Sequence, residues 1–350
     1  MTDMPVDQNT GTMPVQERHQ IDVAALQKYM EENVEGFSGT LSVEEFKGGQ
    51  SNPTYLLTAG GKQYVMRRKP PGKLLKSAHA VDREFRVLSA LQDTDVPTPK
   101  TYALCTNENV IGTMFYIMDY LDGRVIWDST GGPYTPTERG EIWDAANAAL
   151  ASLHNVDFEA VGLSDFGKHS DYIARQITRW SSQYEYTKTD ENPYMDNLIE
   201  YLPKNIPEDD SCTIVHGDPQ IANMVMHKDR NEVIGILDWE LSTLGNPLSD
   251  FAYLCRPYRD ALRGADLKAL GIPEEEEFVA AYCRRTGRDG IPHWDYYIAF
   301  NMFRLAGILQ GIAKRVQDGT AASTHAEQAG AGAYDMAKLA WAQIDKSVKL

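Results

Sequence analysis

The feature that most constrains the fold is a change in hydrophobic period about a third of the way along the chain. Up to about residue 120, short apolar segments typical of β-strands surround one amphipathic helix at residues 77–91. From residue 136 onward, apolar residues mostly recur at helical spacing, and strand-like segments return only at residues 212–216, 224–227 and 233–239. This order predicts an α+β fold, with a sheet-rich part followed by a larger, mainly helical part.

The expected elements can be placed by number. We predict an initial helix at residues 21–34, after a polar and disordered N-terminus at residues 1–20. The strands of the first part are expected at residues 41–46, 54–60, 62–67, 100–106 and 112–121. The helices of the second part are expected at residues 136–157, 171–186 and 192–202, and again from residue 247 to the end.

The formal net charge of −16 argues against a protein whose main work is to bind nucleic acid, because such proteins neutralise phosphates with lysine and arginine. The same charge is compatible with a small cationic substrate. Residues 67–76, RRKPPGKLLK, form a local basic run. This run is either a contact for a polyanion, such as a nucleotide or coenzyme A, or a solvated loop.

Cysteine spacing and hydropathy indicate a cytoplasmic protein. The cysteines form no CxxC pair, so neither a zinc site nor a disulfide framework is expected. They are Cys105, Cys212, Cys255 and Cys283. The first 16 residues lack the pattern of a signal peptide, and no apolar run has the length of a membrane span. We therefore expect no membrane partner.

The segment HGDPQIAN, residues 216–223, places Asp218 and Asn223 on one loop. Phosphoryl transfer from ATP needs an aspartate that accepts a proton from the attacking hydroxyl, and oxygen ligands for magnesium. An amide oxygen ligates such a cation without adding charge. A strand, a turn at residues 228–232 and a second strand then return Asp238 beside Asn223. The alternative is a structural hairpin with surface acids.

This loop and the following GILDWELSTLGNPLSDFAYL resemble the aminoglycoside phosphotransferase and choline kinase family, relatives of protein kinases. The segments FKGGQSNPTYLL, VDREFRVLSAL and IGTMFYIMDYLDG are similar in particular to the kinase-like domain found with some acyl-CoA dehydrogenases. The resemblance covers about residues 35–320. It implies a protein kinase-like two-lobe fold. A small antiparallel N-lobe at residues 21–120 and a helical C-lobe at residues 121–350 would hold ATP and magnesium.

The resemblance also implies roles for individual residues. Asp218 would be the catalytic base, and Asn223 and Asp238 would hold magnesium. His216 would brace the loop. Asp250, at the start of a helix, would support the loop as well, because a carboxylate there can accept hydrogen bonds from backbone amides.

For ATP, the resemblance implies contacts from three segments of the first part. Arg67 would contact the phosphates and form an ion pair with Glu84. Arg68 remains an alternative to Arg67, because side chains alternate along a strand and only one of the two arginines can face the cleft. The alternative for Glu84 is an exposed glutamate of the helix. A flexible loop over the phosphates and a hinge whose backbone binds adenine complete the set. Without the HGDPQIAN segment downstream, the flexible loop would be better interpreted as a simple hairpin turn. These two segments are Gly48, Gly49, Gln50, Ser51 and Asn52, and Met118, Asp119, Tyr120 and Leu121.

The acceptor is expected to be a small molecule. Only 11 residues separate Asp238 from Asp250, too few for the activation segment on which protein kinases dock peptides. The 94 residues between Leu121 and His216 form a helical insert whose aromatic residues are either core or the wall of a substrate pocket. These aromatics are Trp180, Tyr184, Tyr186, Tyr194 and Tyr201.

The resemblance favours a hydroxyacyl-CoA or related acyl compound as acceptor, and a partner dehydrogenase that would use the phosphate as a leaving group. The alternatives are an aminoglycoside or choline-like cation, a pseudokinase that only binds a dehydrogenase, and a nucleotide-binding protein that slowly hydrolyses ATP. The chain departs from many relatives at Gln220, where they have arginine, and at Ala222, where they have an acid. The change at Gln220 bears on the identity of the substrate.

Overall fold

The structure, a computed structural model, describes residues 11–47, 52–70, 80–128, 130, 132–319 and 326–350. By its internal contacts the chain divides into two compact units. Unit 1 comprises residues 1–127, 161–163 and 222–242, and unit 2 comprises residues 128–160, 164–221 and 243–350. Segment 222–242, which the sequence prediction places in the C-lobe, is therefore grouped with unit 1 by its contacts.

Unit 1 contains a six-stranded antiparallel sheet in the order β1-β2-β3-β4-β6-β5. Its strands are β1 (Thr12–Met13), β2 (Ser42–Phe46), β3 (Thr54–Ala59), β4 (Lys62–Arg68), β5 (Thr101–Cys105) and β6 (Phe115–Asp119). The five strands predicted here are all present. β1 and the 3-10 helix η2 (Glu17–His19) lie in the segment expected to be disordered; instead β1 pairs with β2.

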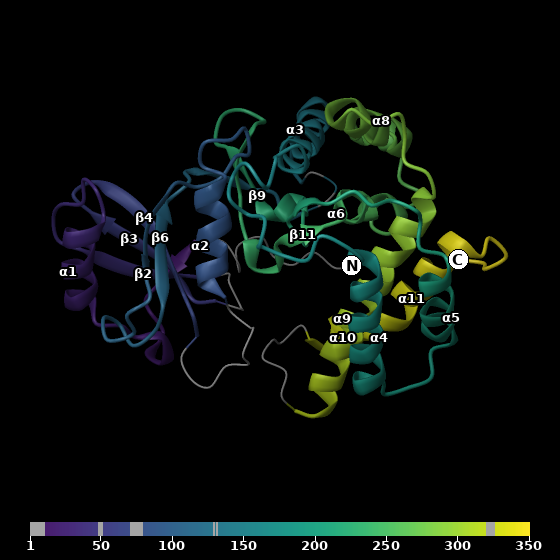
Figure 1. The fold of residues 1–350 in the computed structure, drawn as a ribbon, viewed down its shortest axis with the longest axis horizontal. Helices are drawn as coiled ribbons and strands as arrows, with labels where there is room; N and C mark the ends of the chain where they lie inside the picture. The colour runs from purple at the N-terminus through teal and green to yellow at the C-terminus, as the bar shows by residue number, and fades with distance from the viewer. Residues whose placement is uncertain (1–10, 48–51, 71–79, 129, 131, 320–325) are drawn as a thin grey trace. The chain divides into compact units, whose positions relative to one another are not determined.

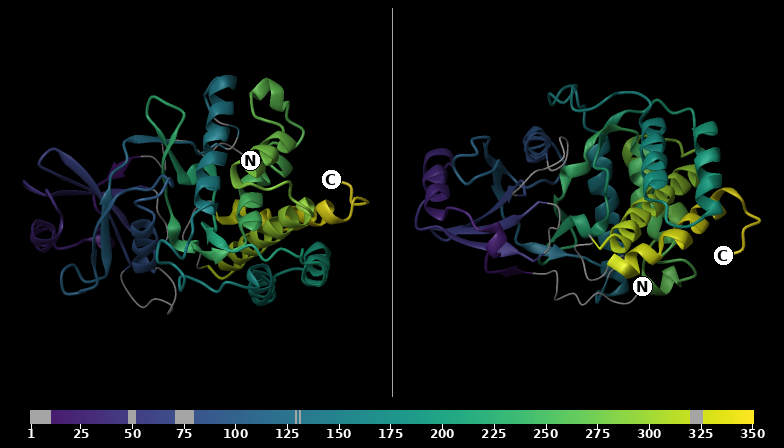
Figure 2. Two further views of the ribbon diagram at one scale, coloured as in Figure 1. Left: turned by 45° about the horizontal axis from the view of Figure 1, so that its top comes forward. Right: turned by 90° about the horizontal axis from the view of Figure 1, so that it is seen from below.

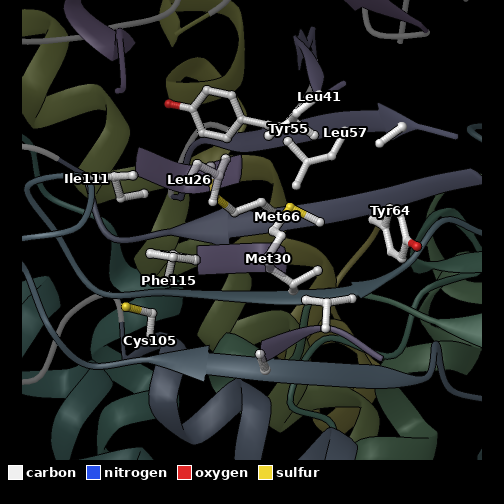
Figure 3. Packing of buried hydrophobic residues seen from close by; sticks show 14 residues of the cluster. Leu26, Met30, Leu41, Tyr55, Leu57, Tyr64, Met66, Cys105, Ile111 and Phe115 are labelled. Atoms are coloured by element: carbon white, nitrogen blue, oxygen red, sulfur yellow. The ribbon is translucent and has the colours of Figure 1, made fainter. Parts of the chain in front are cut away.

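Two helices cover opposite faces of this sheet, α1 (Val23–Asn33) and α2 (Val81–Ala90) (Figure 1). The face toward α1 holds the apolar core, where Leu26 and Met30 of α1 pack on Met66 of β4 (Figure 3). Because side chains alternate along a strand, Arg67, the next residue of β4, points to the other face, toward α2. Strand parity thus decides which arginine faces α2.

A smaller sheet completes unit 1. It has the order β10-β9-β7, with β7 (Gly123–Val125), β9 (Met224–His227) and β10 (Val233–Ile236). The predicted hairpin from β9 to β10 is present, and the 3-10 helix η5 (Trp239–Leu241) follows it. β7 was not predicted, because three residues are too few to show a period.

Unit 2 is mainly helical, as predicted. Its helices are α3 (Pro136–His154), α4 (Tyr172–Thr187), α5 (Pro193–Tyr201), α6 (Pro247–Cys255), α7 (Leu267–Leu270), α8 (Glu275–Thr286), α9 (Trp294–Gln317), α10 (Ala326–Ala331) and α11 (Ala333–Ile344). The 3-10 helices are η3 (Leu202–Lys204) and η6 (Arg256–Arg259), and η4 (Ile221–Asn223) crosses the boundary between the units. Strands β8 (Thr213–Val215) and β11 (Thr243–Gly245) pair antiparallel beside the helices.

The long helix α9 organises unit 2. It packs against α4, α6, α10 and α11, and Figure 2 shows the yellow C-terminal helices lying against the teal helices α4 and α5. Local sequence signals set the helix ends. At the start of α3, Thr135 is the N-cap and forms a reciprocal capping box with Glu138, and Pro136 lies in the first turn. Within the described residues, no helix has both the length and the apolar character that a membrane span requires.

Candidate active site

In unit 1, Arg67 forms the ion pair that the sequence predicts. Its Nε lies 2.9 Å from Glu84 Oε2, and its Nη2 lies 2.7 Å from Asp238 Oδ1. Arg68 instead donates to the backbone oxygen of His19 at 3.1 Å, with its guanidinium over the Tyr55 ring. Arg67, not Arg68, therefore lies beside the predicted magnesium ligand.

Asp238 has an unusual backbone conformation. The register pairs Ile236 with Met224, and the amide of Leu237 donates to the backbone oxygen of Asn223 at 2.8 Å, so the hairpin brings the chain at Asp238 back to Asn223 as predicted. Asp238 has a φ of 66°, and in the described part of the chain only two other non-glycine residues have a positive φ. Aspartate and asparagine tolerate this left-handed conformation better than most residues. Such conformations cluster at functional sites.

Glu84 is the buried centre of a polar network. Its Oε1 accepts from Asn52 Nδ2 at 2.9 Å, and its Oε2 accepts from the Tyr116 hydroxyl at 3.1 Å. Burial raises the pKa of Glu84 to about 7; the charge of Arg67 opposes this shift, and Asp238 and Glu240 add to it. The Asn52 amide, expected near the phosphates, is directed to Glu84 in this structure.

The raised pKa of Glu84 predicts a pH-dependent effect on stability. Between its ordinary value of 4.5 and about 7, the folded state binds more protons than the unfolded state, so the free energy of unfolding falls as the pH rises through this window. Glu84→Gln removes this pH-dependent contribution to the free energy of unfolding. We expect the free energy of unfolding of the variant, relative to wild type, to increase by roughly 1 to 3 kcal/mol between pH 4.5 and pH 8.

Urea unfolding of both proteins across this range provides the measurement. Glu32→Gln, which changes an exposed glutamate of α1, is the matched control and should give a difference that does not vary with pH. A Glu84→Gln difference that stays flat or falls as the pH rises contradicts the assigned pKa.

In unit 2, the backbone of the HGD segment is bound by a buried aspartate. Asp250 accepts from the amide of His216 at 2.7 Å and from the amide of Gly217 at 2.8 Å. Burial alone would raise the pKa of Asp250, but hydrogen bonds from His154 and Gly217 lower it below its usual range. Gly217 has a φ of 89°, which a side chain would strain. Asp250 thus supports the loop as predicted, while the helix cap of α6 is Asn246.

Asp218 lies at the end of this segment. Its amide donates to His216 Nδ1 at 3.3 Å, as expected for a bracing histidine, and its Oδ2 accepts from Gln220 Nε2 at 2.9 Å. Arg304, which was not predicted from the sequence, donates from Nη2 to the backbone oxygen of Gly217 at 3.1 Å, and its guanidinium lies over the buried ring of Tyr253. A signal for the place of Tyr253 was present, because this residue lies three residues after Asp250 on α6 and so shares its helix face.

The predicted hinge lies where β6 leaves the sheet. Met118 is buried and pairs with Val65, and Asp119 accepts a hydrogen bond from the Tyr102 hydroxyl. The Tyr120 ring stacks on Phe46 with centroids 6.5 Å apart. The side chains of Met118, Asp119 and Tyr120 thus make contacts within unit 1. The adenine contact predicted for residues 118–121 is one of backbone groups.

The remaining predicted residues are those of the loop over the phosphates, the basic run and the aromatic residues of the helical insert. The loop residues Gly48, Gly49, Gln50 and Ser51, and most of the basic run, lie outside the described residues. The aromatic residues of the insert do not share one setting: Trp180 and Tyr184 are buried, and Tyr186 is 86% exposed. Tyr194 packs on Tyr334, and Tyr201 on Trp341.

Comparison with known proteins decides the family. The model of the phosphotransferase enzyme family matches residues 42–300, well over half of the chain. The chain belongs to this phosphotransferase family. A solved structure from Ralstonia eutropha JMP134, described as a candidate aminoglycoside phosphotransferase, is 47% identical with a TM-score of 0.87, over 95% of this chain and 100% of that chain.

Two further relatives set the limits of the comparison. Acyl-CoA dehydrogenase family member 10 of Mus musculus is 42% identical over 340 residues, which are 95% of this chain and 32% of that protein. The chain spans less than half the length of the curated relatives it matches. A thermostable mutant of aminoglycoside phosphotransferase APH(4)-Ia, in ternary complex with AMP-PNP and hygromycin B, shares only the fold: TM-score 0.60 and 16% identity over 91% of this chain and 98% of that one.

The family and the fold confirm two predictions from the sequence. The resemblance to aminoglycoside phosphotransferases is correct, and the fold class is the kinase-like α+β fold of these enzymes. The donor set also fits magnesium, which is commonly held by one or two carboxylates together with phosphates and water rather than by an all-protein cage. Among the described residues, no group of three or more histidine, cysteine, aspartate or glutamate side chains that could hold a metal ion is found.

Proposed function

We propose that the chain is a magnesium- and ATP-dependent phosphotransferase that acts on a hydroxyl group of a small molecule. The observation that carries the proposal is the contact between Arg67 and Asp238 at 2.7 Å, with Arg67 anchored by Glu84. It joins a cation suited to phosphate oxygens and a carboxylate suited to magnesium. AMP-PNP in the distant structural neighbour supports ATP as the donor.

Each residue has a role in the proposed reaction. Asn223 and Asp238 would hold magnesium, which neutralises phosphate charge when bound. Arg67 contacts the phosphates, the segment at residues 48–52 covers them, and the backbone at residues 118–121 binds adenine. Asp218 accepts the proton of the acceptor hydroxyl while the oxygen of that hydroxyl bonds to the γ-phosphorus. The bond from the γ-phosphorus to the leaving ADP oxygen breaks.

We propose a hydroxyacyl-CoA or a related hydroxylated acyl compound as the acceptor. The support is the acyl-CoA dehydrogenase name of a relative that matches 95% of this chain. In such a pathway, phosphorylation turns a hydroxyl into a leaving group, and a dehydrogenase partner would act on the product. The four cysteines are free thiols, which suits the cytoplasm that we propose as the location.

One observation favours the cationic alternative. A hollow of about 320 Å³ in unit 2 is lined by Asp190, Glu191 and Tyr334, among others. Carboxylates and an aromatic ring suit an amine, as in an aminoglycoside or choline. We therefore include cationic compounds in the test.

An acceptor panel separates these functions. Purified protein is incubated with magnesium-ATP and hydroxyacyl-CoA thioesters that carry the hydroxyl at different carbons, or with hygromycin B or choline, and phosphorylated products are detected by mass spectrometry. We expect product from at least one thioester and none from the amines. Product from an amine alone reverses the acceptor assignment. ATP binding without any product supports a binding module, and ATP hydrolysis that no acceptor accelerates supports a slow ATPase.

A further inference from the structure

Two helices of unit 2 bind the backbone of Gly217, the residue before Asp218. Asp250 of α6 accepts from the Gly217 amide at 2.8 Å, and Arg304 of α9 donates from Nη2 to the Gly217 oxygen at 3.1 Å. That oxygen belongs to the peptide group whose nitrogen is the amide of Asp218. Glycine has more conformational freedom than any other residue, and Gly217 has a φ of 89°. The two hydrogen bonds therefore restrict the backbone on both sides of the Gly217 α-carbon.

The side chain of Arg304 is itself held in place. It is only 4% exposed, and its Nη1 donates to Asn301 Oδ1 at 3.3 Å, about one turn earlier on α9. The Asn301 amide nitrogen donates to the backbone oxygens of Ser249 and Tyr297 at 2.7 and 3.0 Å, which turns the Asn301 oxygen toward the arginine. The Arg304 guanidinium carbon also lies 5.6 Å from the centroid of the Tyr253 ring. These contacts direct the guanidinium to the loop.

The surroundings of Arg304 are unusual for a buried cation. In the described part of the chain, the groups that contact its guanidinium are neutral: the Gly217 oxygen, the Asn301 oxygen and the Tyr253 ring. Burying a charge without an opposite charge is costly, and a well-packed apolar side chain of similar size often serves stability as well or better. Stability alone therefore accounts poorly for an arginine here, whereas a need to hold the Gly217 oxygen accounts for it.

We propose that Arg304 is a positioning residue for Asp218, which it holds through the peptide group between Gly217 and Asp218. The inference rests on the proposed function. A base contributes fully only when it is aligned with the proton that it removes, and small misplacements of reacting groups lower the rate strongly. Because Arg304 contacts the backbone of the loop and acts through Asp218, its loss should slow turnover without weakening substrate binding.

Arg304→Met tests this, because methionine keeps an unbranched side chain and removes the charge and every donor. With magnesium-ATP and the hydroxyacyl-CoA that turns over fastest in the panel, we expect kcat to fall about ten- to a hundredfold and both KM values to stay within about twofold. Arg304→Lys keeps the charge and a donor but lacks the planar fork that reaches Gly217 and Asn301 together. Its kcat should lie between those of the wild type and Arg304→Met, at least about threefold below the wild type.

Arg139→Met is the matched control. Arg139 belongs to α3 of unit 2 and also donates to two backbone oxygens, those of Leu270 at 3.3 Å and Gly132 at 3.0 Å. Its loss removes the same donors from a part of unit 2 that the proposed reaction does not use. We expect Arg139→Met to leave kcat within about twofold of the wild type.

A second measurement makes the Arg304→Met change in Asp218→Asn protein. If Arg304 acts through Asp218, its loss there should cost less than about twofold in kcat, because the base that it positions is already absent. An arginine that only maintains the fold would lower kcat equally in both backgrounds.

Several results would overturn the inference while the phosphotransferase function stands. They are a folded Arg304→Met protein that keeps kcat within about threefold of the wild type, an equal loss of kcat in the Asp218→Asn background or in Arg139→Met, and a rise in KM at unchanged kcat. If Arg304→Met does not fold, Arg304→Lys decides, and a loss of less than about threefold in kcat overturns the inference. Absence of product from the wild type with every acceptor overturns the proposed function, and this inference with it.

Discussion

Asp218→Asn is expected to lower kcat for acceptor phosphorylation about 100- to 10,000-fold, the range that a positioned general base contributes. The affinity for magnesium-nucleotide should change little, because the change removes the base while Arg67, Asn223 and Asp238 remain. Asparagine is the appropriate replacement, since it keeps the size of the side chain and an oxygen that can accept from Gln220 Nε2.

Steady-state kinetics and nucleotide titration together measure this effect. Asp196→Asn, an exposed aspartate of α5 that pairs with Lys188, is the control for loss of an aspartate in unit 2 and should leave kcat unchanged. If Asp218→Asn retains kcat within about twofold, Asp218 is not the base. A parallel loss of nucleotide affinity would instead indicate a damaged loop.

Asp238→Asn is expected to weaken magnesium-dependent nucleotide binding and lower kcat/KM about 100- to 1,000-fold. The physical reason is the loss of the charged ligand from a pair in which Asn223 contributes only a neutral oxygen. Asparagine also tolerates the left-handed backbone at this position, where φ is 66°, so the result reports on charge rather than on strain.

A magnesium titration at fixed nucleotide provides the measurement. The control is Asp229→Asn, which makes the same replacement in the turn between β9 and β10 of the same hairpin, away from Arg67. We expect Asp238→Asn to require a much higher magnesium concentration and Asp229→Asn to match the wild type. Unchanged magnesium dependence in Asp238→Asn excludes this aspartate as the metal ligand.

The strands of unit 1 show how far periodicity predicts structure. All five expected strands formed, because each is a short segment that contains aromatic or β-branched residues, and glycine or proline lies near many of the ends. The elements that periodicity missed, β1, β7 and β11, have two or three residues each. Elements this short depend on the partner strand they find in the folded chain, which no local pattern reveals.

The site shows the same division. The contact between Arg67 and Glu84 was predictable, because a resemblance placed both residues and a strand alternates its faces. The hydrogen bond from Arg304 Nη2 to the backbone oxygen of Gly217 was not predicted, since it joins residues 87 positions apart on separate elements.

The sequence by itself determined the α+β class, the phosphotransferase family and the identity of the polar residues of the loop and hairpin, because period, turn residues and motif spacing are local properties of the chain. Only the tertiary structure decided that Arg67 rather than Arg68 lies beside Asp238 and that Arg304 binds the backbone of the HGD segment. These contacts depend on which faces are buried together and on which hydrogen-bond partners polar groups find once water is excluded. Both depend on segments that are far apart in the chain, so no single stretch of residues determines them.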